Sequence, residues 1–375
     1  MNAAPDAIVV GAGIVGAACA FELAKEGMRV AVVANGPVGA GATGASMGHI
    51  VVMDDSEAQF ALTRYSQILW EELFPELPPD VEFERCGTIW VAANDEEMAE
   101  VRRKYGYYLD RAVDVEILDS RLLGHAEPHL RTPLAGGLLV HGDSVLYPPR
   151  AAAYLIQRAQ SCGAQIHLGK QVVAMGQGSA RLSDGTKFSA GVLVNAAGQF
   201  APSLTPGIAI KPRKGHLVIT DRYPGFIRHQ LVELGYLKSA HSLTADSVAF
   251  NLQPRKTGQV LIGSSRQYGA EDSATEPEMI AEMLRRASYY VPELASLSAT
   301  RVWTGFRPAT PDKLPLIGPW PEDKTLFLAA GHEGLGITTS LATAKIIASQ
   351  ILSRRSAIPV EPYLPARQMT PQQHA

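Results

Sequence analysis

The sequence has few cysteines and no long apolar run, and each shortage excludes a class of protein. Its 375 residues include only three cysteines, Cys19, Cys86 and Cys162, which are widely spaced and form no C-x-x-C pair. Scattered single cysteines argue against an intrachain metal or iron–sulfur site and fit a reducing compartment. No run of about 18 apolar residues is present, so the sequence predicts no membrane span.

Charged residues are also few, and acidic and basic residues are nearly equal in number. Charged residues make up 19% of the chain and the formal net charge is −3, which gives no reason to expect nucleic acid as a partner. The N-terminal residues 1–6 have neither the basic region nor the apolar core of a signal peptide. We therefore expect a globular protein of the cytoplasm with no bound metal. At 375 residues the chain is too long for one simple core, and two domains are expected.

The strongest motif lies near the N-terminus. Ile8, Val9 and Val10 form a β-branched run that is typical of a buried parallel strand. The next residues, 11–16, read G-x-G-x-x-G, and helix-forming residues follow to Lys25. In such a turn the first glycine permits the bend, the second admits a pyrophosphate and the third lets helix and strand pack closely. The order strand, glycine turn, helix predicts a dinucleotide site, and a tight turn in another α/β protein is the alternative.

The second strand, residues 30–33, ends without the usual acidic residue. A carboxylate that binds the ribose is expected about 20 residues after the glycines, but the strand here leads into Ala34 and Asn35. Asn35 can still hydrogen-bond a ribose hydroxyl without contributing charge. The following stretch, residues 36–49, holds five glycines among small and hydroxyl residues. It suits close approach of a flat or phosphorylated ligand, and a flexible loop is the alternative.

Two later stretches have the same character. Residues 191–198 are expected to form a second buried strand that ends in small residues and returns the chain to the first sheet. Near the C-terminus, Gly305-Phe306-Arg307-Pro308 precedes a strand over 326–330 and another glycine turn at Gly331-His332-Glu333-Gly334. A helix follows that turn. Amphipathic helices are also expected over 57–73, 95–109 and 277–290, and the tail after Ser356 should be frayed.

Together, these stretches resemble the D-amino acid oxidase (DAO) family of flavoproteins, over roughly residues 7–355. Within that family the block 331–340 looks most like the branch of bacterial D-hydroxyproline dehydrogenase and opine oxidase, with glycine oxidase nearby. The resemblance implies a two-domain α/β (α+β) fold of glutathione-reductase-like topology. A discontinuous Rossmann-like FAD domain would take residues 1–84, 141–212 and 305–356. A mixed-sheet substrate domain would take 85–140 and 213–304, leaving 357–375 as a tail.

The resemblance also implies which residues bind FAD. The pyrophosphate would lie at the first glycine turn, residues 43–49 would run along the pyrophosphate and flavin, and the last glycine turn would lie at the flavin pyrimidine edge. The cofactor-binding residues expected in this way are Gly11, Gly13, Ile14, Val15, Gly16, Asn35, Thr43, Ala45, Ser46, Gly48, Val172, Val173, Ala197, Gly198, Gly331, Gly334, Gly336, Ile337 and Thr338. The covalent-flavin cysteine of monomeric sarcosine oxidase has no counterpart after Cys162. Noncovalent FAD is therefore favoured, with His49 as the alternative tether.

Arg307 is the foremost candidate for chemistry. Its planar guanidinium can grip a carboxylate with two charge-assisted hydrogen bonds, and the resemblance places it over the flavin. A structural arginine beside Pro308 is the alternative. His49 and His332 lie on loops expected to face the flavin and could bind a hydroxyl or amine of the substrate. Tyr236 and Tyr268 are candidates to cover the pocket.

These residues predict oxidation of a small amino acid by hydride transfer from Cα to flavin N5. The resemblance of the block 331–340 implies D-hydroxyproline or D-proline as the substrate, and the one strong cation on the expected pocket loops, Arg307, suits a single carboxylate. Glycine or sarcosine oxidation is an alternative. A second alternative is the FAD subunit of a multisubunit opine oxidase, with Arg255 or Lys256 as a second cationic anchor. A monooxygenase would usually add a second nucleotide fingerprint, which the sequence lacks. Oxygen or another electron acceptor, and partner subunits, complete the expected partners.

Overall fold

The computed structural model describes residues 4–235, 246–270 and 272–369, and the chain divides into two compact units. Unit 1 comprises residues 1–81, 147–212 and 306–375, and unit 2 comprises residues 82–146 and 213–305. The domain boundaries expected from the sequence lay near residues 84, 141, 212 and 305. Assignment of FAD to one unit and of substrate to the other stays a prediction.

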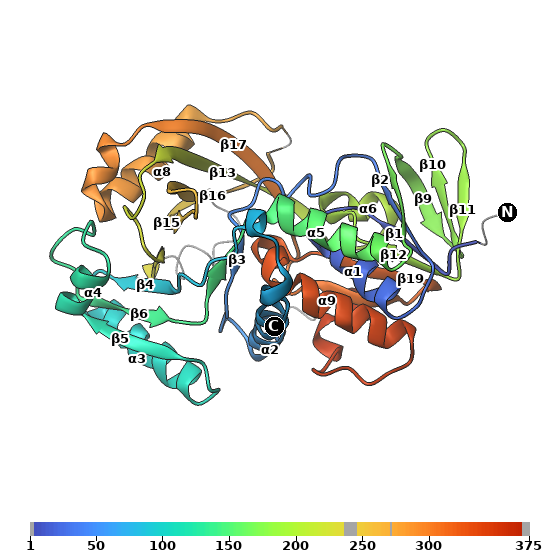
Figure 1. Cartoon of the computed structure of the whole chain (residues 1–375), viewed down its shortest axis with the longest axis horizontal. Helices are drawn as coiled ribbons and strands as arrows, with labels where there is room; N and C mark the ends of the chain where they lie inside the picture. The colour runs from blue at the N-terminus through green and yellow to red at the C-terminus, as the bar shows by residue number, and fades with distance from the viewer. Residues whose placement is uncertain (1–3, 236–245, 271, 370–375) are drawn as a thin grey trace. The chain divides into compact units, whose positions relative to one another are not determined.

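Unit 1 is built on a sheet of six strands, of which five run parallel and the edge strand β18 runs antiparallel to β19 (Figure 1). In spatial order the strands are β18 (Leu316–Trp320), β19 (Asp323–Ala330), β12 (Val192–Asn195), β1 (Ala7–Val10), β2 (Val30–Ala34) and β8 (Gln165–Leu168). Every residue of β1 and β2 is buried, as the β-branched runs predicted. The expected α/β fold class is confirmed.

Helices pack on this sheet and on one another. Those of unit 1 are α1 (Ile14–Lys25), α2 (Glu57–Leu73), α5 (Pro148–Ser161), α6 (Ala201–Leu204) and α9 (Gly336–Ile351). Helix α1 packs against both α5 and α9 (Figure 1). Ten of its twelve residues are buried, four of them alanines, so neighbouring backbones can approach closely. This packing places the N-terminal ends of α1 and α9 in the same unit as the glycine turns.

A small antiparallel sheet completes unit 1. It contains β9 (Val172–Gly176), β10 (Ser179–Leu182) and β11 (Lys187–Ser189), and β10 pairs antiparallel with both of the others. Ala180 and Leu182 of β10 join the apolar cluster that also contains Ile8 and Val33 of the main sheet. The short strand β3 (His49–Ile50) follows the glycine-rich loop.

Unit 2 is organised around a mixed sheet of eight strands. In spatial order they are β17 (Ala299–Ala309), β13 (Lys211–Arg222), β16 (Gln259–Tyr268), β15 (Ser247–Pro254), β14 (Gln230–Glu233), β4 (Thr88–Ala92), β6 (Gly136–Val140) and β5 (Val115–Asp119). Helices in the described part of unit 2 include α3 (Asp95–Leu109), α4 (Ser120–Ala126) and α8 (Pro277–Tyr290), and a short strand β7 covers Ser144–Val145. Helix α8 packs on β15 and β16, where Met283 and Tyr290 enter an apolar core with Phe250 and Leu252. The expected mixed sheet is therefore present.

The segment after Ser356 is not frayed over its described part, so this expectation was wrong. Tyr363 is 1% exposed, and its hydroxyl donates to the carbonyl of Ala58 at 2.6 Å. Arg367 pairs with Asp312 at 2.6 Å. A buried aromatic ring and an ion pair, both formed with residues distant in sequence, fix a stretch whose composition alone suggested disorder. Among the described helices, none combines the length and apolarity needed to cross a bilayer.

Candidate functional site

The turn between β1 and α1 is tightly enclosed by backbone. Gly11 has φ +113°, and a Cβ added there would lie 2.4 Å from the carbonyl oxygen of Ala196, at the end of β12. A Cβ on Gly16 would lie 2.1 Å from the carbonyl oxygen of Gly11. The first and third glycines of the motif are therefore required by contacts of the protein with itself. The third holds helix and strand together, as the motif predicted.

The N-terminus of α1 suits an anion. Gly13 is the N-cap residue and contributes no side-chain cap, and the first turn holds no acidic residue. The N–H of Ile14 donates to Oγ1 of Thr43 at 3.0 Å, which docks the glycine-rich loop onto the helix end. The helix dipole and the N–H groups of the first turn, which includes Val15, give this end the chemistry that a pyrophosphate needs.

The glycine-rich loop is folded by its own hydrogen bonds. Ser46 Oγ donates to the carbonyl of Thr43 at 2.8 Å, and the N–H of Ala45 donates to Gly41 at 3.2 Å. Thr43 and Gly48 are buried. The alternative of a merely flexible loop is not supported over these residues.

The end of β2 offers little to a ribose. Ala34 is buried and its carbonyl accepts the N–H of Lys170 at 3.0 Å, whereas Asn35 is exposed. Two of the expected cofactor-binding residues, Val172 and Val173, lie next to each other on β9 and differ in burial. Val172 packs against the core of unit 1, and Val173 is 37% exposed. Val173 is thus the one with surface left for a ligand.

The end of β12 is held by a buried amide. Nδ2 of Asn195 donates to the carbonyl of Ala201 at 3.0 Å and to Oγ1 of Thr205 at 2.9 Å, and its Oδ1 accepts the N–H of Ala197 at 3.2 Å. These bonds fix the start of the Ala197–Gly198 turn beside Gly11.

The last glycine turn leads into α9, and distant residues hold it. Thr338 Oγ1 donates to the carbonyl of His49 at 2.9 Å and accepts the N–H of Val51 at 3.3 Å. Trp70 Nε1 donates to the carbonyl of Ile337 at 3.2 Å. Sequence reasoning missed Trp70, which lies 267 residues from its partner and has no local signal. Helix α9 also begins without a side-chain cap or an acidic first turn, so its end can stabilise negative charge.

His332 faces the interior of unit 1. It is 5% exposed, and its Nε2 lies 2.9 Å from Oγ1 of Thr343. That hydroxyl donates its own hydrogen to Thr339 at 2.8 Å, so Nε2 must carry the proton and donate. Burial lowers the pKa of His332 to about 3, so the ring is neutral at physiological pH.

Arg307 lies beside the same turn. Ala309, at the end of β17, forms an isolated antiparallel bridge with His332, which brings the two stretches together. A Cβ added to Gly334 would lie 3.9 Å from both Cδ and Nε of Arg307. The residue is only partly buried. The structure thus gathers Arg307, Gly331, Gly334 and the start of α9 in one place.

Two further candidates, Arg255 and Tyr268, lie in unit 2. Arg255 forms bonds within this unit, where it pairs with Glu82 at 2.7 Å and donates to the carbonyl of Leu146 at 3.1 Å. Tyr268 accepts a hydrogen bond from Arg213 at 3.0 Å in unit 2. Tyr236 lies outside the described residues. Within the described part of the chain, no group of three or more His, Cys, Asp and Glu side chains could hold a metal ion.

These features fit a flavin dinucleotide. At two helix ends of the same unit, those of α1 and α9, the N-cap residue makes no side-chain hydrogen bond, and first-turn N–H groups there suit a pyrophosphate and the anionic edge of a flavin. The space next to Gly11 and Gly16 is closed to side chains by backbone atoms. Residues that could hold the cofactor there are Gly13, Ile14, Val15, Thr43 and Ser46 at the first end and Gly336, Ile337 and Thr338 at the second.

Comparison with known proteins gives the same answer. Residues 6–350 match the family model described as DAO, FAD dependent oxidoreductase. Hydrogen cyanide synthase subunit HcnC of Pseudomonas aeruginosa is 30% identical, with 98% of this chain and 97% of the relative covered. Glycine oxidase of Geobacillus kaustophilus is 29% identical, with 96% of each covered.

Solved structures agree with the sequence comparison. The crystal structure of Geobacillus kaustophilus glycine oxidase superposes with a TM-score of 0.86 at 28% identity, covering 96% of this chain and 98% of that one. L-Proline dehydrogenase from P. horikoshii, at 23% identity and a TM-score of 0.85 over 98% of both chains, shares the fold. The expected resemblance is confirmed. The chain belongs to the DAO family of FAD-dependent oxidoreductases, and FAD is its cofactor.

Proposed function

We propose that this protein oxidises a small secondary amino acid, D-hydroxyproline or D-proline first, to its imine. The observation that carries the proposal is the position of the Arg307 side chain beside Gly334, at the turn that opens α9. A guanidinium at that turn can hold a carboxylate next to the helix end that would face the flavin. The family assignment supplies the redox chemistry.

In this proposal, the side chains of the protein act mainly by holding the substrate in position. Arg307 holds the substrate carboxylate with two parallel hydrogen bonds, which aims the Cα–H in one direction. When bound, FAD supplies a hydride acceptor at N5. The N-terminus of α9 stabilises the negative charge that develops on reduction. Noncovalent binding is proposed, with Thr43 and the α1 end holding the pyrophosphate.

The two histidines have different roles in this proposal. His332 is neutral and donates to Thr343, so we assign it to holding the turn in shape and not to proton transfer. His49 is partly buried, and its carbonyl is bonded to Thr338. Its ring remains a candidate to contact the substrate amine or hydroxyl.

The charge around the candidate site favours a substrate with one carboxylate. An opine carries at least two, and of the two basic residues suggested for the second, Arg255 is neutralised by Glu82 and Lys256 is exposed. The glycine oxidase relative supports an amino acid substrate and keeps glycine or sarcosine as the rival. The relative named as a hydrogen cyanide synthase subunit supports partner subunits, in a multisubunit opine oxidase or a similar complex. Oxygen or another acceptor would reoxidise the flavin, in the cytoplasm.

The test is reduction of the flavin in the absence of oxygen. The holoenzyme is mixed anaerobically with cis-4-hydroxy-D-proline, D-proline, glycine, sarcosine or an opine, and loss of the visible flavin absorption is followed. We expect the two D-configured ring amino acids to bleach the flavin fastest. Faster bleaching by glycine or sarcosine would move the protein to the oxidase branch, and bleaching by the opine alone would refute the single-carboxylate argument.

A further inference from the structure

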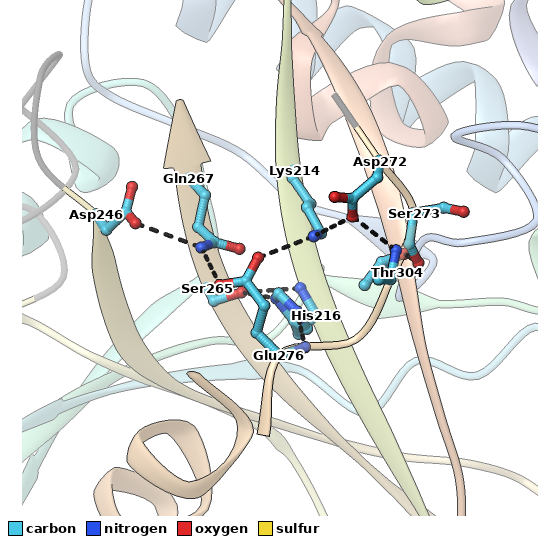
Figure 2. A network of polar contacts seen from close by, with 10 residues as sticks. Lys214, His216, Asp246, Ser265, Gln267, Asp272, Ser273, Glu276 and Thr304 are labelled. Carbon is cyan, nitrogen blue, oxygen red and sulfur yellow. Dashed lines mark hydrogen bonds and ion pairs between the residues drawn. The ribbon is translucent and has the colours of Figure 1, made fainter. Parts of the chain in front are cut away.

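The segment 272–276, which immediately precedes α8 in unit 2, is held by one buried lysine. Nζ of Lys214 on β13 donates to Asp272 at 3.2 Å and to Glu276 at 2.9 Å (Figure 2). The Lys214 side chain is 1% exposed, whereas the two carboxylates are 78% and 42% exposed. Burial alone would lower the pKa of Lys214, but the hydrogen bonds to Glu276 and Asp272 raise it above its usual value. The ammonium therefore stays charged beneath the segment.

Neighbouring strand residues fix the end of the segment. Nε2 of Gln267 on β16 donates to Glu276 at 2.7 Å and to Asp246 at 3.3 Å. The N–H of Glu276 donates to Nε2 of His216 at 3.1 Å, and the other ring nitrogen of His216 lies 2.9 Å from Oγ of Ser265. Figure 2 shows these side chains converging from β13 and β16 on the segment. It is thus held through both its backbone and its side chains.

The pinned segment in turn holds β17. Thr304 Oγ1 donates to the carbonyl of Ser273 at 2.7 Å. Oδ1 of Asp272 accepts the N–H of Ala274 at 2.9 Å, which fixes the turn around that carbonyl. Thr304 precedes Arg307 by three residues in the same continuous strand, and Ala309 is held by its bridge to His332. Arg307 therefore lies between two anchored positions of one strand.

We propose that Lys214 and Thr304 are positioning residues for Arg307. This inference rests on the carboxylate-binding role proposed above for Arg307. Among the described strands, β17 lies at the edge of its sheet next to β13, so side-chain anchors matter more for it than for a central strand. Three residues of strand span about 10 Å, and a displacement of about 1 Å at its end is enough to spoil a bidentate contact.

The readout is the binding of a planar substrate analogue to the holoenzyme. Pyrrole-2-carboxylate has the ring and carboxylate of proline but no Cα–H to lose, so its Kd can be measured from the shift of the flavin spectrum. Thr304→Val removes the bond to Ser273 at nearly constant volume, and we expect the Kd to rise about fivefold, as for one lost hydrogen bond. Thr304→Ser should restore it.

Lys214 is tested with a conservative pair of variants. Lys214→Met should raise the Kd at least about tenfold, because both carboxylates of the segment lose their cationic partner, and Lys214→Arg, which keeps the charge, should bring most of the affinity back. Arg286→Met is the matched control. Arg286 lies in the same unit, and its hydrogen bonds and ion pair join it to Glu233 of β14. It should lower the melting temperature without changing the Kd.

A double-mutant cycle separates positioning from general loss of stability. In an Arg307→Leu background, Thr304→Val should cause no further loss of pyrrole-2-carboxylate binding, because the anchored group is gone. If Arg307→Leu alone leaves the Kd unchanged, the proposed carboxylate role fails. If Arg307→Leu weakens binding but folded Thr304→Val and Lys214→Met proteins both bind within twofold of wild type, the positioning role is wrong.

Discussion

Thr338 and His49 are joined by a hydrogen bond of 2.9 Å, although 289 residues separate them in the sequence. The Thr338 hydroxyl donates to the carbonyl of His49 and accepts the N–H of Val51, so a single side chain fixes the strand after the glycine-rich loop to the start of α9. Both stretches are expected to line the flavin. The relative position of these two stretches therefore depends on the hydroxyl group of Thr338.

Replacing Thr338 by valine should destabilise the protein. The variant keeps the shape but leaves the buried N–H of Val51 and the carbonyl of His49 without this partner, at a cost of about 1–3 kcal/mol. Urea denaturation of the holoenzyme measures the loss, and Thr338→Ser should restore most of it. An unchanged unfolding free energy in Thr338→Val would show that the bond contributes nothing.

Gly11→Ala should abolish FAD binding. The added methyl would lie 2.4 Å from the carbonyl oxygen of Ala196, so the turn under the proposed pyrophosphate must move. Gly27→Ala is the matched control, because Gly27 also has positive φ (+86°) but nothing within 4 Å of an added Cβ. The control should lose some stability and keep its flavin. The flavin-to-protein ratio after purification distinguishes the two variants.

Arg307→Leu should abolish turnover at ordinary substrate concentrations while FAD stays bound. Each hydrogen bond to a charged group contributes about 1.5–3 kcal/mol, and each 1.4 kcal/mol is a factor of ten, so KM should rise by about a hundredfold or more. Stopped-flow reduction of the flavin over a wide substrate range gives the measurement. Normal saturation by an amino acid in this variant would remove Arg307 from the carboxylate role.

His332 should make stability depend on pH. Its folded pKa of about 3 lies below the ordinary value of 6.5, so between these values the unfolded chain binds a proton that the folded ring does not. The unfolding free energy should therefore be highest above pH 6.5 and fall as the pH drops toward 3. His332→Gln retains a donor for Thr343 and cannot titrate. The difference in unfolding free energy between wild type and variant, measured from pH 7 to 5, should shrink with acid, and a constant difference would contradict the buried neutral ring.

FAD should be released by acid. The only expected tether is His49, and the three cysteines offer no counterpart to a covalent-flavin cysteine. Precipitating the protein with acid should leave the yellow colour in the supernatant. Colour in the pellet would show a covalent bond, and the same assay on His49→Asn would then locate it.

Local signals in the sequence determined much of the framework. The helices expected over 57–73 and 95–109 coincide with α2 and α3, because Ser56 and Asn94 cap them by accepting the N–H groups of Gln59 and Glu97. The strand, glycine turn and helix at the N-terminus were equally readable, since each requirement acts between residues close in the chain. The family resemblance followed from the same stretches.

Only the tertiary structure decided which side chains meet. Strand β14 was not expected, because four residues reading Gln-Leu-Val-Glu have no strong pattern, and pairing with β4 and β15 makes them a strand. Arg255 was a candidate anchor until folding placed Glu82 next to it, 173 residues away in sequence. The composition of the stretch after Ser356 predicted a frayed tail, but the Tyr363 side chain is buried in the folded protein. Spacing along the chain carries no information about such contacts, because their energy comes from burial and pairing between segments that are adjacent only once the sheets have formed.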